Sequence, residues 1–343
     1  MSKKHVTIPL FIPHHGCPHR CAFCNQHLTT GTGQLPRRKD VIEKIEQYLG
    51  KIKTSVERIE AAFFGGSFTG ITPEYQKELL GAAYGYLQKN IIQGIRVSTR
   101  PDFIDEDRLS LLKKYGVTTI ELGIQSFHDN VLMASQRGHT ARDSMRALEL
   151  VKRMGFQFII QLMPGLPGDS REISLQSALT ARGYSPGGVR IYPAVVLKNT
   201  GLYTLYEMGL YTPLSLEEAI ELCRDITVIM EESHIPVIRT GLHPMADDET
   251  ANIAAGPYHP SFGFFVKSRL KRDVMEKKIK DFIAINGHGV DRKLVMSIPR
   301  KSVEEYIGHR TGNILYLKNN YSLKGLAYEV CDCDEVHVDN ARI

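Results

Sequence analysis

Three cysteines near the start of the chain have the spacing of a metal-ligand loop. Cys17, Cys21 and Cys24 are half of the six cysteines, and they follow one another at intervals of four and three residues. Gly16 and Pro18 disfavour a buried helix there, so we expect a loop that turns three thiolates toward one point. Thiolates are soft ligands that suit zinc or an iron–sulfur cluster. In a cluster of four irons, three cysteines leave one iron open for another molecule.

Spacing alone leaves other interpretations of the three cysteines open. They could be buried by chance as small hydrophobic side chains. A disulfide would leave an odd thiol, and the N-terminus lacks the apolar segment and cleavage site of a signal peptide. A structural zinc ion is the main alternative, because His14, His15, His19 and His27 are near enough in sequence to supply a fourth ligand.

Length and composition indicate an ordinary globular protein. The chain has 343 residues, of which 42% are hydrophobic and 24% charged, enough for a sizeable core and two domains. No apolar run approaches the roughly 20 residues that span a bilayer, so we expect a cytoplasmic protein with no membrane partner. The remaining cysteines, Cys223, Cys331 and Cys333, are then expected to be reduced thiols. A net charge of +5 permits a polyanionic partner without requiring one.

Short apolar runs alternate with helical patterns over roughly the first 240 residues. Strands are predicted at 6–13, 59–64, 95–99, 117–122, 156–163, 189–192 and 235–238, with helices between them. This alternation predicts a parallel sheet of βαβ units, in which strand-to-helix loops build the site at one edge. The cysteine loop and segments 65–67, 99–100, 123–126, 163–168 and 190–193 all fall at such strand ends. Their co-location indicates an enzyme with a bound ligand.

The pattern changes after about residue 246. A turn-rich aromatic segment is followed by residues 267–280, which carry seven Lys or Arg against two acids. Further strands are predicted at 294–298, 326–330 and 335–338, with helical segments between residues 302 and 320. We therefore predict a barrel over residues 1–245 and a small C-terminal α/β domain over residues 246–343.

Seven short segments in a fixed order carry a resemblance to a known family. They are CPHRC at 17–21, FGGSFT at 64–69, TRPD at 99–102, LGIQS at 122–126, RGHT at 137–140, MPGLP at 163–167 and VRIYP at 189–193. Together they resemble the radical S-adenosylmethionine (SAM) domain of the Elongator catalytic subunit, which modifies the wobble uridine of tRNA. A more distant similarity runs to oxygen-independent coproporphyrinogen oxidase. The resemblance implies a partial (β/α)6 TIM-like radical SAM barrel with a small C-terminal α/β domain.

The resemblance also implies the cofactors and the residues that hold them. Cys17, Cys21 and Cys24 would bind a [4Fe-4S] cluster, and the amino and carboxylate groups of S-adenosyl-L-methionine would chelate its open iron. Positions that match SAM-contacting residues of the family are Phe23, Gly65, Gly66, Ser67, Thr99, Gln125, Arg137 and Gln161. Arg190 and Tyr192, on a late strand, would face substrate. Ser67 departs from the family, where threonine is commoner.

Family chemistry implies that the reduced cluster cleaves SAM and that the resulting 5′-deoxyadenosyl radical abstracts hydrogen from the substrate. An electron donor such as a flavodoxin or a ferredoxin would be the partner. The family's C-terminal acetyltransferase domain has no counterpart in this sequence, and we find no glycine-rich acetyl-CoA loop. The step after hydrogen abstraction is therefore left open.

The substrate is predicted from the family segments and the basic stretch. Both point to tRNA, and Lys267, Arg269, Lys271 and Arg272 are expected to lie near the barrel mouth and contact phosphates. A solvated helix face explains the same charges equally well. Two other functions stay open: a radical SAM enzyme for a small molecule such as a tetrapyrrole, and a zinc-stabilised nucleic-acid-binding protein.

Overall fold

The main sheet has seven strands, all parallel, in the order β1-β2-β3-β4-β5-β6-β8. The computed structural model describes residues 5–12, 16–17, 19–24, 35–52, 56–245, 250–286 and 293–340. The strands are β1 (His5–Ile12), β2 (Arg58–Gly65), β3 (Gly94–Thr99), β4 (Val117–Gln125), β5 (Gln157–Leu162), β6 (Gly188–Ile191) and β8 (Val237–Thr240). The predicted α/β fold is confirmed, and the seven predicted strands form one sheet, one strand more than the (β/α)6 barrel implied by the resemblance.

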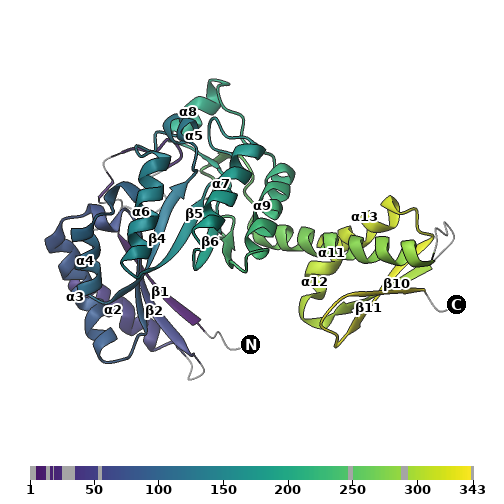
Figure 1. Ribbon diagram of the computed structural model, residues 1–343, viewed down its shortest axis with the longest axis horizontal. Coiled ribbons are helices and arrows are strands. Elements are labelled where there is room, and N and C mark those ends of the chain that lie inside the picture. The colour runs from purple at the N-terminus through teal and green to yellow at the C-terminus, as the bar shows by residue number, and fades with distance from the viewer. Residues whose placement is uncertain are drawn as a thin grey trace.

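Helices cover the outer face of this sheet (Figure 1). They are α2 (Arg38–Leu49), α3 (Pro73–Gln88), α4 (Glu106–Lys114), α6 (Ala141–Arg153), α7 (Arg171–Gly183) and α9 (Leu216–Glu231). In α6, a Thr140–Asp143 capping box starts the helix, and Ala147, Leu148 and Val151 form its buried face. Such faces and the outward side chains of the strands join in one continuous core.

The sheet is curled, as the contacts of one side chain show. Arg190 lies on β6, yet its guanidinium is 5.9 Å from the ring centroid of Phe64 on β2, and its Nε is 3.0 Å from Glu121 on β4. Neighbouring strands are about 4.8 Å apart, so a flat sheet would hold β2 and β6 too far apart for this contact. These residues therefore face the inside of a half-barrel, which we call the lumen.

Short elements complete the barrel. They are α5 (Asp129–Ala134), α8 (Gly201–Glu207), the 3-10 helices η1 (Phe68–Gly70) and η2 (Pro101–Phe103), and an antiparallel pair of β7 (Val196–Leu197) and β9 (Ile253–Ala255). The two 3-10 turns follow β2 and β3 directly, so they lie at the edge where the strands end. None of these elements is long enough to show a periodic pattern in the sequence.

A long helix, α11 (Phe262–Asn286), leads from beside α9 into the C-terminal part (Figure 1). There β10 (Lys293–Pro299) pairs in parallel with β11 (Gly325–Cys331) and antiparallel with β12 (His337–Asn340). The remaining elements are α12 (Val303–Ile307), α13 (Gly312–Asn320), η3 (Arg300–Ser302) and η4 (His309–Thr311). Phe262 and Val266 belong to the barrel core, whereas Met275 and Ile279 belong to a second core. One helix thus serves both cores, and the boundary at residues 245 and 246 stays a prediction.

One expectation about cysteines is wrong. Cys331 and Cys333, expected as reduced thiols, form a disulfide at the end of β11, where their Cα atoms are 5.3 Å apart. That separation lies in the range a disulfide can bridge, which spacing in the sequence could not reveal. Within the described ranges, no helix is long and apolar enough to cross a membrane.

Candidate functional site

The cysteine loop lies at the C-terminal edge of the sheet and is anchored by backbone contacts. The Ala22 amide donates to the Ser135 carbonyl at 2.9 Å, and the Leu202 amide donates to the Ala22 carbonyl at 2.6 Å. A third bond, from the Cys24 amide to the Cys21 carbonyl at 3.0 Å, closes a turn between two of the cysteines. Phe23, between these anchors, packs against two small apolar clusters.

The three thiols lie close enough to influence one another. Burial and the neighbouring Cys21 and Cys17 together raise the pKa of Cys24 to about 12, while Arg137 opposes them. Thiols in this state give up their protons when a cation is present to take the thiolates as ligands. The donor set therefore suits an iron–sulfur cluster, although among the described residues no three His, Cys, Asp or Glu side chains form a ready-made site for a single ion.

Of the four histidines proposed as zinc ligands, the structure describes only His19. His14, His15 and His27 lie outside the described residues. The ring of His19 packs on the backbone at Gly138, where a Cβ would be 2.4 Å from a ring carbon. Gly138, with φ +78°, therefore lets the 137–140 segment approach the cysteine loop.

A glycine turn after β2 meets the cysteine loop through backbone atoms. A Cβ on Gly16 would be 2.4 Å from the Ser67 carbonyl oxygen, and one on Gly70 would be 2.2 Å from the Gly16 oxygen. Gly65 has a φ of +108°, a conformation that favours glycine. The buried Ser67 hydroxyl has no hydrogen-bond partner among the described residues, so it is available to a ligand.

Polar side chains continue this edge along β3, β4 and β5. The Thr99 hydroxyl lies 2.5 Å from that of Thr69, and Gln161 donates to the Gln125 side-chain oxygen at 3.2 Å. Gln125 has a φ of +71°, a left-handed conformation that is costly for a residue other than glycine and is concentrated at functional sites. The positions matched to SAM contacts thus lie along adjacent strand ends.

Arg137 connects this edge to the cysteines. Its Nη1 donates to Cys21 Sγ at 3.3 Å and its Nη2 to the Gly123 carbonyl at 2.7 Å. A Cβ on Gly123 would lie 2.8 Å from that Nη2, so a larger residue there would displace the guanidinium. Arg137 Nε is buried without a hydrogen-bond partner among the described residues. Arg100 also donates to Cys21 Sγ, at 3.7 Å.

A row of alternating charges crosses the lumen below this edge. Arg96 bonds Glu60 at 2.6 Å and Glu121 at 2.9 Å, and Glu121 also pairs with Arg190, whose Nη1 is 3.3 Å from the Tyr192 hydroxyl. We call these five residues the charge ladder. Although buried, the Glu60 carboxyl has a lowered pKa because Arg58 and Arg96 stabilise its charge. Arg190 and Tyr192 are thus the end of an ordered network, and their contact with substrate stays a prediction.

Four of these residues were not assigned a role in the sequence analysis. Glu60, Arg96 and Glu121 are single charges in apolar strands, and Arg100 was part of a family segment without a role of its own. A lone buried charge within a predicted strand is the signal that could have marked the first three, because such a residue needs a partner.

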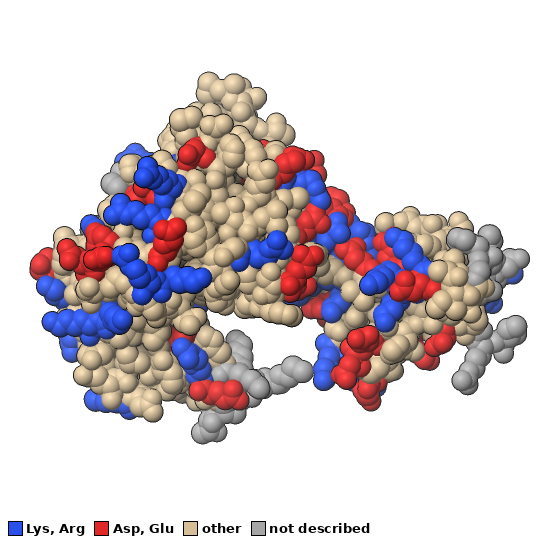
Figure 2. All heavy atoms as spheres, in the orientation of Figure 1, with Lys and Arg blue, Asp and Glu red and all other residues tan. Residues whose placement is uncertain are grey.

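The basic stretch is largely occupied by carboxylates. Arg269 forms ion pairs with Glu217 and Glu221 of α9, and Arg272 lies 3.5 Å from Glu221 and 4.0 Å from the centre of the Tyr316 ring. Their side chains are only 16% and 12% exposed. Figure 2 shows Lys and Arg interspersed with Asp and Glu where the barrel meets the C-terminal part. Phosphate contact stays a prediction for all four residues, and these ion pairs count against it for Arg269 and Arg272.

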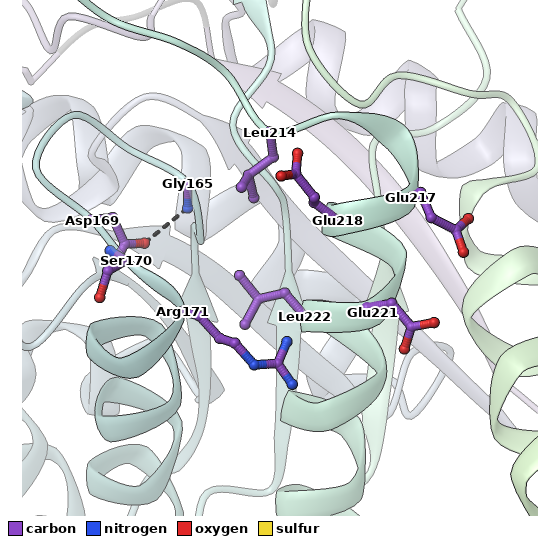
Figure 3. A pocket seen from close by; sticks show the side chains of 9 residues that line it. All are labelled: Gly165, Asp169, Ser170, Arg171, Leu214, Glu217, Glu218, Glu221 and Leu222. Carbon is purple, nitrogen blue, oxygen red and sulfur yellow. Dashed lines mark hydrogen bonds between the residues drawn. The ribbon is translucent and has the colours of Figure 1, made fainter.

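A cavity of about 350 Å³ lies between the starts of α7 and α9, in the helical layer rather than in the lumen (Figure 3). Leu214 and Leu222 line it together with several carboxylates. Asp169 accepts bonds from the Gly165 amide and the Ser174 hydroxyl, Glu218 caps α9 at Ser215, and Glu221 binds arginines. These carboxylates are engaged in holding the local structure.

Two sequence profiles match the chain. One, described as the radical SAM superfamily, matches residues 11–175, and another, described as the radical SAM C-terminal domain, matches residues 186–272. The first runs from the end of β1 through the cysteine loop to the start of α7. The second covers β6 through to the first half of α11.

Curated relatives and a solved structure agree with these matches. The tRNA uridine(34) acetyltransferase of Methanocaldococcus infernus is 30% identical over 245 residues, which cover 60% of this chain and 46% of the relative. Elongator complex protein 3 of Mus musculus is 30% identical over 207 residues, covering 54% and 38%. This chain thus spans less than half the length of either relative. The structure of Methanocaldococcus infernus Elp3 is similar in fold, with a TM-score of 0.62 and 23% identity over 80% of this chain and 64% of that one.

Proposed function

Because the chain belongs to the radical SAM superfamily, we propose that it is an enzyme that uses a [4Fe-4S] cluster and SAM to modify a uridine of tRNA. One observation carries the proposal: the loop that bears three neighbouring thiols meets the glycine turn after β2 and lies beside the polar ends of β3 to β5, at one edge of the half-barrel. A cluster and an amino-acid ligand beside it need this arrangement of soft donors, open backbone and polar side chains.

Each part of this edge has a role in holding the cofactors. Cys17, Cys21 and Cys24 would ligate three irons, and the Gly65–Gly66–Ser67 turn would bring backbone groups and the unpartnered Ser67 hydroxyl to the SAM amino group. The buried Arg137 guanidinium would face the SAM carboxylate, for which its planar geometry is suited. Thr99, Gln125 and Gln161 would accept or donate hydrogen bonds to the ribose and methionine portions.

When bound and reduced, the cluster supplies the electron for SAM cleavage and so for hydrogen abstraction from substrate. This chain's residues contribute position and exclusion of water. Phe23 and its apolar neighbours shield one side of the cysteine loop. The charge ladder fixes Arg190 and Tyr192 on the inner surface, where they would orient the substrate. The electron would come from a partner of the flavodoxin or ferredoxin class.

The substrate assignment rests on the names of the relatives and on two lysines. Both similar proteins are named for tRNA uridine chemistry or for Elongator. Lys267 is 66% exposed and 3.6 Å from Glu305, and Lys271 lies over the Tyr306 ring at 5.1 Å. These weakly held cations are better placed to bind phosphates than Arg269 and Arg272, so the proposal places the tRNA contact on the two lysines.

The cofactor part is tested by anaerobic reconstitution. About four irons per chain and reductive SAM cleavage are expected. Replacing Gly66 by Val should block SAM binding sterically while iron is retained. Stoichiometric zinc without iron would instead favour the zinc-stabilised binding protein, and normal SAM cleavage by the Gly66→Val protein would refute the placement of SAM.

The substrate part is tested by tRNA binding across a salt series. A Lys267→Ala/Lys271→Ala protein should bind more weakly, with a salt slope smaller by about two phosphate contacts. The matched control is Lys39→Ala/Lys44→Ala on α2, since Lys39 is also ion-paired and Lys44 also lies over a tyrosine ring. If wild-type protein has no tRNA affinity at low salt, a small-molecule substrate such as a tetrapyrrole becomes the better hypothesis.

A further inference from the structure

Arg100 is a buried arginine that makes four hydrogen bonds, one of them to a cysteine of the loop. It is 2% exposed and donates from Nε and Nη2 to the Asp102 carboxylate at 3.0 and 2.9 Å. Nη2 also donates to the Arg137 carbonyl at 2.5 Å, and Nη1 to Cys21 Sγ at 3.7 Å. Asp102 therefore holds the Arg100 guanidinium in an orientation that reaches both Cys21 Sγ and the backbone carbonyl of Arg137.

Two guanidinium groups thus converge on one sulfur, since Arg137 donates to the same Cys21 Sγ at 3.3 Å. Asp102 balances the charge of Arg100, but no carboxylate within the described ranges forms an ion pair with Arg137. His139, 3.9 Å from Asp102, is neutral because burial and the two arginines lower its pKa. One positive charge is left in excess next to Cys21. Burying such a charge is costly unless a negative group lies beside it.

We propose that Arg100, positioned by Asp102, acts with Arg137 to set the reduction potential of the cluster through Cys21 Sγ. This inference rests on the proposed function, because it requires the cluster on Cys17, Cys21 and Cys24. Hydrogen bonds to cluster sulfurs and the local net charge are established determinants of such potentials. Reduction adds one electron, taken from an external donor, and so one negative charge that the two guanidinium groups stabilise.

Replacing Arg100 and replacing Asp102 should shift the reduction potential of the cluster in opposite directions. Arg100→Gln removes a cation and leaves Asp102 without its partner, which disfavours the reduced cluster and lowers the potential. Asp102→Asn removes an anion and leaves Arg100 uncompensated, which favours the reduced cluster and raises the potential. A unit charge this near a buried sulfur should change the reduction equilibrium at least tenfold, or about 59 mV for one electron.

The experiment is a redox titration of the anaerobically reconstituted full chain with dithionite, followed by the electron paramagnetic resonance signal of the reduced cluster. Wild type, Arg100→Gln, Asp102→Asn and the charge-preserving Arg100→Lys are compared, with iron content measured for each. Matched controls are Arg108→Gln and Asp105→Asn, because this ion pair lies on the same segment and makes no contact with a cysteine. Both controls should keep the wild-type potential.

Shifts of opposite sign for Arg100→Gln and Asp102→Asn, with Arg100→Lys near wild type, are the expected result. Shifts of the same sign, or none while iron is retained, would overturn the inference, because a merely structural pair would affect both variants alike. If Arg100→Gln loses its iron, a raised potential for Asp102→Asn still supports the inference, and a lowered or unshifted potential for that variant overturns it. Wild-type protein that binds no iron would overturn the proposed function itself, whereas normal SAM cleavage with unshifted potentials would overturn only this step.

Discussion

Protonation of His139 should make the folded state sensitive to mild acid. Its side chain is fully buried, 3.9 Å from Asp102. Burial and the positive charges of Arg137 and Arg100 together lower its pKa to about 3, while Asp102 and the Ile124 backbone oppose them. The His139→Leu protein keeps a side chain of similar size at this position but removes the titratable group.

The sign and size of the effect follow from linkage. Because the folded-state pKa is below the unfolded value of about 6.5, the unfolded chain binds a proton first as the pH falls. The stabilisation is fully present above the unfolded pKa and is lost progressively between about pH 6.5 and 3. At about pH 5, wild type should lose about 2 kcal/mol of unfolding free energy relative to neutral pH through this one group.

The assay is urea unfolding of iron-free wild type and His139→Leu at about pH 7.5 and 5, where the slope against denaturant checks two-state behaviour. Other groups titrate equally in both proteins, so the difference between their pH dependences isolates His139. Wild type should lose about 2 kcal/mol more than the variant on acidification. Identical pH dependence in the two proteins would refute the account of a buried neutral histidine.

Three further outcomes are expected. Gly16→Ala should reduce bound iron several-fold, because its Cβ would be 2.4 Å from a backbone oxygen, whereas Gly312→Ala, whose Cβ would meet nothing within 4 Å, should retain it; equal iron contents would contradict this. Replacing Cys331 and Cys333 together by Ser should leave iron content unchanged, as iron analysis will show, and a loss of iron would make them ligands. Burial raises the pKa of Cys223, so native protein should not be alkylated there by iodoacetamide until it unfolds, as mass spectrometry can determine; rapid native labelling would show that this part of the core opens.

The strands could be predicted from sequence because each is a short apolar run between turn signals. The strand predicted at 59–64 is observed at Arg58–Gly65, and the strand predicted at 95–99 is observed at Gly94–Thr99. Burial on both faces makes such strands continuous in hydrophobicity. The short pair β7 and β9 and the six-residue helix α5 have no such pattern, since tertiary packing rather than local preference forms them.

The cysteine loop and its glycine contacts could be expected at one edge, because the ends of parallel strands meet there. The charges could not be placed in the same way. Arg96 meets Glu121 across 25 residues, and Arg190 meets Glu121 across 69, so no spacing rule connects them. The partners of the basic stretch could not be predicted for the same reason, because a count of charges along α11 does not show that α9 presents Glu217 and Glu221 to it.

The charge ladder is better explained as a device that orients Arg190 and Tyr192 than as a contribution to the stability of the fold. Arg96 is shared by Glu60 and Glu121, and Glu121 is shared by Arg96 and Arg190, so every charge in the row has a partner. Replacing a complete buried network by apolar residues of similar volume is often neutral or stabilising, whereas removing one member costs about 3–5 kcal/mol. An apolar lumen could therefore be as stable, but it would not hold Arg190 with its guanidinium between Glu121 and Phe64 and 3.3 Å from the Tyr192 hydroxyl. What the ladder contributes is a fixed direction for two polar groups on the inner surface, below the edge that gathers the cysteines.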